Sequence, residues 1–186
     1  TGKITPKEAL YVAGTLGAIA FTLVLTLNWL TIGLAFVAAF LAITYPLFKR
    51  FFAIPQAYLG IAFGFGIPMA FAAVTGTIPA VAWLMLIANV FWAMAYDTEY
   101  AMVDREDDLK LGLKTSAITF GQYDVIIVAL CYAITLLLLA WCGHLLAYGW
   151  PYFAGLVVAA AIAVKHIIMI RYRERDPCFR AFKNNN

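Results

Sequence analysis

Long apolar segments, separated by short polar connections, dominate the sequence. Six of them approach or reach the roughly 20 helical residues needed to cross the hydrocarbon core of a bilayer. They cover residues 9–28, 31–48, 56–74, 80–97, 124–142 and 152–170. Because backbone polar groups within a bilayer must be satisfied internally, such segments are expected to be helices. The pattern therefore predicts an all-α, polytopic transmembrane helical bundle with about six spans, forming a single membrane domain over residues 1–186.

The charged residues lie on alternate connections. The connections 28–31, 75–77 and 143–149 contain no Lys, Arg, Asp or Glu, whereas the other connections and both ends of the chain carry the basic residues. Positively charged loops remain in the cytoplasm. We therefore expect both ends of the chain, and the acidic segment described below, on the cytoplasmic side. Arg171, Arg173 and Arg175 are interpreted as a solvated end.

The composition is typical of a membrane protein and argues against several other classes of protein. Charged residues make up 12% of the chain, about half the share typical of soluble domains, and the mean hydropathy is +0.87. Three cysteines and two histidines provide neither a disulfide framework nor a histidine-based metal site. No Walker loop, dinucleotide fingerprint or nucleophile elbow is present, and we expect a lipid bilayer rather than nucleic acid as the partner.

An acidic segment, residues 97–108, emerges directly from the fourth apolar segment. On a helix, Asp104 and Asp108 lie about 20° to either side of Asp97, and roughly 6 Å separates Asp104 from Asp108 along the axis. Glu99 and Glu106 fall on the opposite side. One interpretation is a solvated acidic helix end. However, carboxylates at a membrane boundary are costly, and the shared stripe favours a functional site.

This stripe suits magnesium chemistry. Mg²⁺ is usually held by one or two carboxylates together with substrate phosphates, so Asp104 and Asp108 could bind a magnesium–diphosphate cluster, with Asp97 as a further ligand or as a partner that supports the ligands. Lys114, Lys110 and Arg50 would neutralise the phosphates; the alternative is that these basic residues only determine topology. Tyr96 and Tyr100 could stabilise a cation or form an interfacial aromatic belt.

The third apolar segment contains glycines and a proline. Gly60 and Gly64 would allow a neighbouring helix to approach closely. Pro68 should kink this helix near the middle of the membrane. The kink could shape a cavity, or it could reflect ordinary packing between membrane helices.

The segment 96–116 resembles the second aspartate-rich motif of the UbiA superfamily of intramembrane prenyltransferases, most closely in its bacterial members that prenylate 4-hydroxybenzoate. The segments 45–50, 65–71 and 178–186 are also similar to that subfamily, so the resemblance covers essentially the whole chain.

The resemblance implies a helical bundle around a central cavity, in the bacterial inner membrane, with aspartates at the cytoplasmic mouth. Such enzymes use Mg²⁺ to transfer a polyprenyl group from a polyprenyl diphosphate to 4-hydroxybenzoate in ubiquinone biosynthesis. The family's aspartates correspond to Asp97, Asp104 and Asp108, and its basic residue after the Tyr-Pro stretch corresponds to Arg50. A naphthoquinone precursor or a haem is an alternative acceptor, and a non-enzymatic cation transporter is an alternative function.

Two features depart from the family pattern. The family's first motif, Asn-Asp-x-x-Asp, is absent from these residues, and six spans are predicted where the family has nine. We therefore expect truncation at both ends, with two helices missing before Thr1 and one after Asn186. Residues 1–186 alone are expected to be inactive.

Overall fold

The computed structural model describes residues 4–48 and 50–185, and every regular element in these ranges is a helix. The elements are α1 (Pro6–Val24), α2 (Trp29–Phe48), α3 (Pro55–Gly64), α4 (Gly66–Thr75), α5 (Ala80–Val103), α6 (Arg105–Lys110), α7 (Ser116–Phe120), the 3₁₀-helix η1 (Gly121–Tyr123), α8 (Asp124–Leu145), α9 (Trp150–Ile170) and α10 (Arg175–Asn184).

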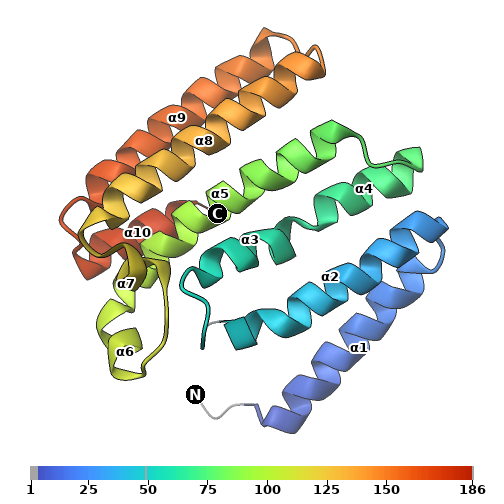
Figure 1. The fold of residues 1–186 in the computed structure, drawn as a ribbon, viewed down its shortest axis with the longest axis horizontal. Coiled ribbons are helices and arrows are strands. Elements are labelled where there is room, and N and C mark those ends of the chain that lie inside the picture. Colours follow the sequence, from blue (N-terminus) through green and yellow to red (C-terminus); the bar gives the residue numbers. More distant parts are fainter. Residues whose placement is uncertain (1–3, 49, 186) are drawn as a thin grey trace.

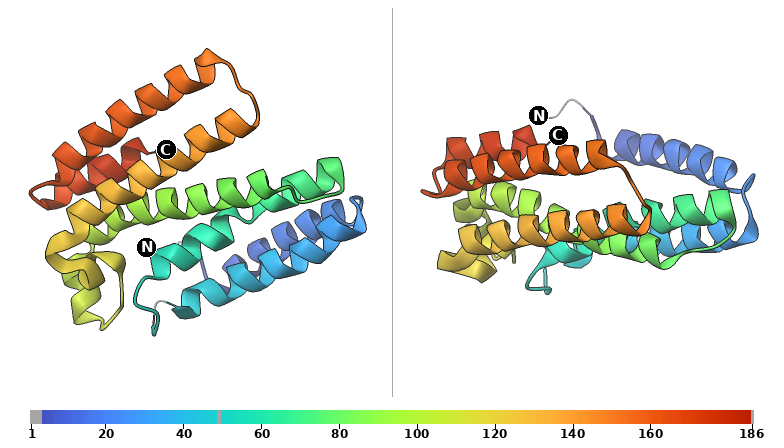
Figure 2. Two further views of the ribbon diagram at one scale, coloured as in Figure 1. Left: turned by 45° about the horizontal axis from the view of Figure 1, so that its top comes forward. Right: turned by 90° about the horizontal axis from the view of Figure 1, so that it is seen from above.

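The described residues contain six helical segments that are long and apolar enough to cross a membrane. They correspond to α1, α2, α3 with α4, α5, α7 through α8, and α9, so the prediction of an all-α bundle with six spans is confirmed. Helices that follow one another in the sequence lie side by side, from α1 and α2 at one edge to α8 and α9 at the other (Figures 1 and 2). Helix α5 is central and contacts α3, α4, α8 and α10.

The third span is broken close to Pro68, where the sequence predicts a kink. Helix α3 ends at Gly64, and α4 begins at Gly66. Pro68 has no N–H to donate to the carbonyl of Gly64, and its ring crowds that carbonyl. The chain therefore changes direction at Phe65 and continues as α4, which confirms the predicted kink.

The glycines of this span permit close packing on α5. A Cβ atom added to Gly60 would lie 2.7 Å from Cα of Val90, which is closer than carbon atoms can approach. The side-chain nitrogen of Asn89 also donates a hydrogen bond of 2.9 Å to the Gly60 carbonyl. Small residues allow membrane helices to gain van der Waals contact at short range, and α3 and α5 associate in this way.

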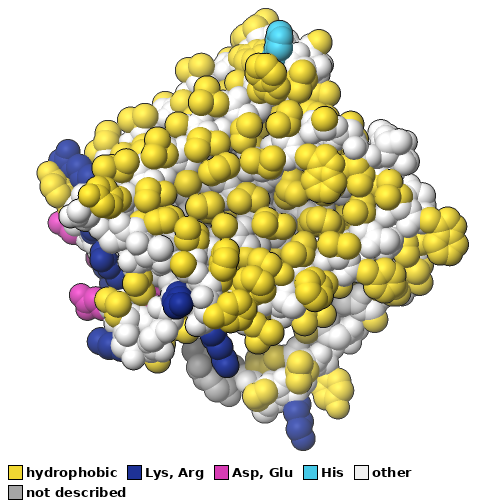
Figure 3. All heavy atoms as spheres, viewed as in Figure 1, with side chains coloured by type: hydrophobic (Ala, Val, Ile, Leu, Met, Phe, Trp, Pro, Cys, Tyr) yellow, Lys and Arg dark blue, Asp and Glu magenta, His cyan; other side chains and the backbone are white. Residues whose placement is uncertain are grey.

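The surface agrees with immersion in lipid. Large apolar side chains such as Trp29 and Trp150 are exposed along the bundle, while many buried apolar residues are small alanines. The face in Figure 3 is largely hydrophobic, and its charged side chains gather at the end where α6 and α10 lie. The protein is therefore a multi-pass membrane protein with its charges concentrated at one end.

Candidate active site at the charged end of the bundle

The acidic segment bends instead of continuing as one helix. Helix α5 ends at Val103, α6 begins at Arg105, and Asp104 lies between them with φ −96° and ψ 4°. The prediction of one continuous helical stripe from Asp97 to Asp108 is therefore wrong beyond Asp104. The cause is burial: Ala101 and Met102 pack in the core, whereas α6 buries no residue, so no packing holds the next turn in line with α5.

Despite the bend, Asp104 and Asp108 remain close to each other. The backbone N–H of Asp108 donates a 2.8 Å hydrogen bond to the Asp104 carbonyl, so these residues remain one helical turn apart. Asp97 lies about two turns earlier on α5. All three residues are partly exposed, which leaves their carboxylates within reach of a ligand from the charged end.

A small hollow borders Asp104. Its volume is about 270 Å³, and it is lined by Tyr100, Val103, Asp104, Arg175, Asp176 and Phe179. The Arg175 guanidinium lies 4.0 Å from the Asp104 carboxylate, and that carboxylate is 31% exposed. Arg175 thus borders the acidic site, while its side chain is 68% exposed, in agreement with the interpretation as a solvated end.

The donor set fits magnesium only in combination with phosphate. Within residues 4–48 and 50–185, no group of three or more His, Cys, Asp or Glu side chains is arranged to hold a metal ion. Partly exposed carboxylates at a helix junction are the oxygen ligands that Mg²⁺ uses when phosphate oxygens and water complete its shell. Asp104 and Asp108 suit such a shared site, with Asp97 as the third candidate ligand.

The predicted basic residues lie near this end but differ in their contacts. Lys114 donates a 3.2 Å hydrogen bond to the Phe51 carbonyl, which ties the α6–α7 connection to the loop between α2 and α3. Arg50 is exposed in that loop. Lys110 pairs with Asp107 at 3.5 Å rather than with an aspartate of the stripe. The neighbouring Lys49 lies outside the described residues.

Arg173 does not belong to a solvated end, so the sequence-based interpretation of this residue is wrong. Its Nε donates a 2.8 Å hydrogen bond to Oδ1 of Asp124, which is fully buried, and its Nη2 donates a 2.7 Å hydrogen bond to the Gln122 carbonyl. Arg105 approaches the other oxygen of Asp124 at 3.9 Å. The hydrogen bond to Asp124 raises the pKa of Arg173, and this pair fixes the start of α8 against the segment after α9.

An aromatic ridge connects the hollow with the bundle interior. Trp92 and Tyr96 have ring centroids 4.7 Å apart on α5. Phe182 of α10 lies 5.9 Å from the Tyr96 ring and 4.8 Å from the Tyr100 ring. Tyr100 lines the hollow beside Asp104, so aromatic faces extend from the carboxylate to Trp92.

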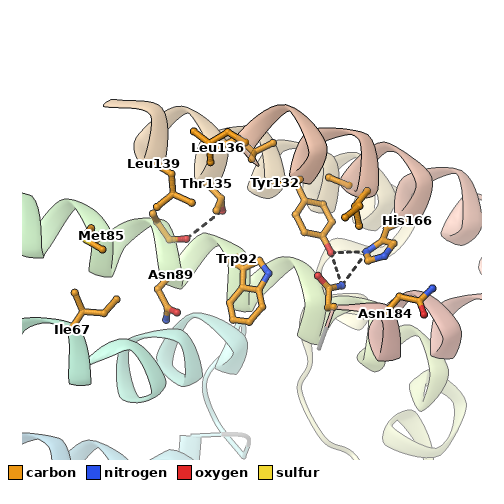
Figure 4. Close-up of a pocket in the computed structure, with 16 residues that line it drawn as sticks. Ile67, Met85, Asn89, Trp92, Tyr132, Thr135, Leu136, Leu139, His166 and Asn184 are labelled. Carbon is orange, nitrogen blue, oxygen red and sulfur yellow. Dashed lines mark hydrogen bonds between the residues drawn. The ribbon is translucent and has the colours of Figure 1, made fainter. Parts of the chain in front are cut away.

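Trp92 also lines a larger cavity inside the bundle. This cavity has a volume of about 480 Å³, and its walls are mainly apolar side chains of α4, α5, α8 and α9 (Figure 4). Polar side chains gather at one end, where Tyr132 and His166 turn toward the end of α10. An apolar cavity, an aromatic ridge and a carboxylate site thus follow one another along α5, an arrangement that suits a long hydrocarbon chain carrying a charged head group.

The sequence pattern does not single out Glu99. The apolar pattern predicts that the fourth span ends at residue 97, before Glu99, yet α5 extends to Val103 and the Glu99 side chain is fully buried. A carboxylate within a membrane-length helix was the available signal, because such residues usually have functional partners.

Comparison with known proteins places the chain in a family. It belongs to the UbiA prenyltransferase family, whose sequence profile matches residues 1–186. The resemblance noted in the aspartate segment is thereby confirmed.

The most similar proteins include three described as 4-hydroxybenzoate octaprenyltransferases. The one from Cupriavidus metallidurans is 66% identical over 185 residues, that from Cupriavidus necator is 65% identical over 185 residues, and that from Azoarcus sp. is 62% identical over 186 residues. The matches cover 100% of this chain but 63%, 65% and 65% of those proteins. The chain thus spans slightly less than two thirds of the length of these relatives.

A solved structure shares the fold. The apo structure of a UbiA homolog from Aeropyrum pernix K1 superposes with a TM-score of 0.84 at 21% sequence identity, covering 99% of this chain and 70% of that one. At this identity the match establishes the helical architecture alone.

Proposed function

We propose that the protein containing this chain transfers a polyprenyl group from an allylic diphosphate to the aromatic ring of 4-hydroxybenzoate, a step in ubiquinone biosynthesis. The observation that carries the proposal is the pair Asp104 and Asp108, one helical turn apart at the charged end and joined to an apolar cavity by aromatic side chains. The names of the relatives support 4-hydroxybenzoate as the acceptor.

Asp104 and Asp108, with Asp97, would bind the diphosphate through Mg²⁺. The metal would supply Lewis-acid stabilisation of the diphosphate as it leaves. Arg50 and Lys114 would balance the remaining phosphate charge, while Lys110 would act at the rim, because it already pairs with Asp107. Tyr100, at the edge of the hollow, would lie close to the allylic carbon.

The apolar cavity has two roles in this proposal. Its walls would hold the polyprenyl chain by excluding apolar surface from water. They would also keep water away from the electron-poor allylic carbon, so that the aromatic ring is the available nucleophile. The aromatic faces of Tyr96 and Phe182 would stabilise positive charge along the route from the hollow.

The proposed location is the bacterial inner membrane, with the charged end in the cytoplasm. The distribution of basic residues supports this orientation, since the three connections at the opposite end carry no charge. A soluble diphosphate head group would then reach Asp104 from the cytoplasm.

The test is a product assay with the full-length protein in membranes. We expect Mg²⁺-dependent prenylation of 4-hydroxybenzoate, loss of product with a chelator, and much lower turnover with a dihydroxynaphthoate or a haem as acceptor. Preferred turnover of either competing acceptor would assign another prenyltransferase activity. Transport of a divalent cation into vesicles without any prenylated product would favour the transporter alternative.

A further inference from the structure

The Glu99 carboxylate is fully buried at the centre of a polar cluster. The Tyr132 hydroxyl donates a 2.8 Å hydrogen bond to Oε1 of Glu99, and the Asn185 side-chain nitrogen donates one of 2.9 Å to Oε2. His166 Nδ1 lies 3.7 Å from Oε1, beyond hydrogen-bond distance. The cluster therefore joins α5, α8 and α9 to the end of α10.

The cluster forms the polar end of the 480 Å³ cavity. Tyr132, His166 and Asn185 line this cavity, and Glu99 lies behind Tyr132. In Figure 4 the polar atoms of Tyr132 and His166 face the end of α10, whereas Leu139, Met85 and Ile67 lie toward the opposite end. A ligand in the cavity thus meets a cluster of hydrogen-bonding side chains at the end nearest α10, whereas the polar residues Asn89 and Thr135 elsewhere in the lining already donate to backbone carbonyls.

Around the Asn185 amide, hydrogen-bond acceptors outnumber the N–H groups that the amide can donate. The Asn185 amide has two N–H groups, but its nitrogen faces Glu99 Oε2 at 2.9 Å, Tyr132 Oη at 2.8 Å, His166 Nδ1 at 3.1 Å and the Ala181 carbonyl at 3.4 Å. The single Tyr132 proton is already donated to Glu99. A ligand that brings a donor would satisfy an acceptor that the amide cannot reach at the same time.

The chemistry of the substrates selects which ligand group fits. A polyprenyl chain has no hydrogen-bonding group, so it gains nothing from this end of the cavity. A carboxylate brings only acceptor oxygens, so it would not supply the donor that is missing beside Glu99 and Tyr132. A phenolic hydroxyl is neutral and can donate to Tyr132 Oη, which already donates to Glu99.

We propose that Tyr132, backed by Glu99 and Asn185, forms a subsite for the hydroxyl group of a phenolic acceptor. This inference rests on the proposed prenyl transfer and adds an acceptor site to it. Trp92 lines the same cavity and offers a ring face to the acceptor, and the ridge from Trp92 to Tyr100 leads toward Asp104. The acceptor carboxylate would point away from Glu99 toward the basic mouth.

The test compares the binding of two ligands that differ by one hydroxyl group. The full-length protein, its Tyr132→Phe variant and its Tyr152→Phe variant are assayed for equilibrium binding of radiolabelled 4-hydroxybenzoate and benzoate, in parallel with prenyl transfer. Tyr152→Phe is the matched control, since its hydroxyl donates to the Leu139 carbonyl at 2.8 Å and lies outside the cavity lining.

We expect the wild-type protein and Tyr152→Phe to bind 4-hydroxybenzoate at least tenfold more tightly than benzoate. Tyr132→Phe should weaken 4-hydroxybenzoate binding roughly tenfold and leave benzoate binding unchanged, since it removes the polar partner of the hydroxyl. Equal weakening of both ligands, or no change in either, would overturn the subsite. If Tyr132→Phe does not fold, Glu99→Gln decides the question, because its amide adds a donor to the cluster and should reduce the same preference. Absence of prenyl transfer by the wild-type protein would instead count against the proposed function.

Discussion

The backbone N–H of Ser116 donates a hydrogen bond of 3.0 Å to Oε1 of Gln56, and both residues are buried. The Ser116 hydroxyl in turn lies 2.7 Å from that of Thr98, the residue after Asp97 on α5. Gln56 is the second residue of α3, after the loop that carries Arg50, and Ser116 lies two residues after Lys114. The α2–α3 loop with Arg50 and the α6–α7 connection with Lys114 are therefore held in fixed positions relative to α5, which carries Asp97.

Replacement of Gln56 by alanine should weaken the interaction with the prenyl diphosphate. The change leaves the buried Ser116 N–H without its acceptor, at a cost of about 1–3 kcal/mol, and releases the loop that carries Arg50. We expect a several-fold rise in KM for the diphosphate in membrane assays. Gln122→Ala, at an exposed position, is the control; equal kinetics for both variants would show that the tether does not position the basic loop.

Replacement of Gly60 by alanine should destabilise the bundle. The added methyl group would collide with the Val90 backbone, so α3 and α5 must separate, at roughly 1–3 kcal/mol. Thermal unfolding in detergent measures the effect. Gly66→Ala is the matched control, because a Cβ there meets no atom of the described residues within 4 Å. Equal melting temperatures for the two variants would contradict the close-packing interpretation.

Arg173→Gln should destabilise the protein more than Arg171→Gln. Loss of Arg173 leaves the buried Asp124 carboxylate with the Val125 backbone N–H and the distant Arg105, whereas Arg171 stacks on its neighbour Tyr172. We expect a cost of roughly 2–3 kcal/mol, below the value for a fully buried pair because Arg173 is partly exposed. Unfolding of both variants in detergent tests this difference. Similar stabilities would mean that Asp124 does not depend on Arg173.

Thiol labelling in intact cells tests the orientation. A cysteine at Thr77, which is exposed at the uncharged end, should react with a membrane-impermeant reagent, and one at Lys110 should not. Thr31 is unsuitable because it is buried beside Asn28. The native cysteines are buried, and burial raises the pKa of Cys178, in α10, to about 11, so this thiol stays protonated at neutral pH. The reverse labelling pattern would place the aspartates on the outer side.

The sequence predicted the spans and the one-sided charge because hydropathy and helix-breaking residues act locally. Pro68 is an example, since its effect falls on the carbonyl four residues earlier. The bend at Asp104 was not predictable in this way. It depends on which residues of the acidic segment find a core to pack against, and that core is built by helices distant in sequence.

The polar cluster of Glu99, Tyr132, His166 and Asn185 likewise depends on contacts between residues that are distant in sequence. Glu99 meets Tyr132, which lies 33 positions later in the sequence, and Asn185, which lies 86 positions later. Helical periodicity placed Glu99 opposite the aspartates but could not identify what lies there. Arg173 was likewise assigned to a solvated end, because only the folded chain brings it to Asp124.

The central claim, that Asp104 and Asp108 hold the diphosphate through Mg²⁺, is tested most directly by Mg²⁺-dependent transfer of a radiolabelled prenyl diphosphate to 4-hydroxybenzoate. The full-length protein is compared with its Asp104→Ala, Asp108→Ala and Glu106→Ala variants at equal folded amounts in membranes. We predict at least a hundredfold loss of turnover for each aspartate variant, because positioning of the diphosphate is lost, and near-normal turnover for Glu106→Ala, whose side chain is exposed in the same segment. Turnover by Asp104→Ala and Asp108→Ala equal to that of Glu106→Ala would contradict the claim.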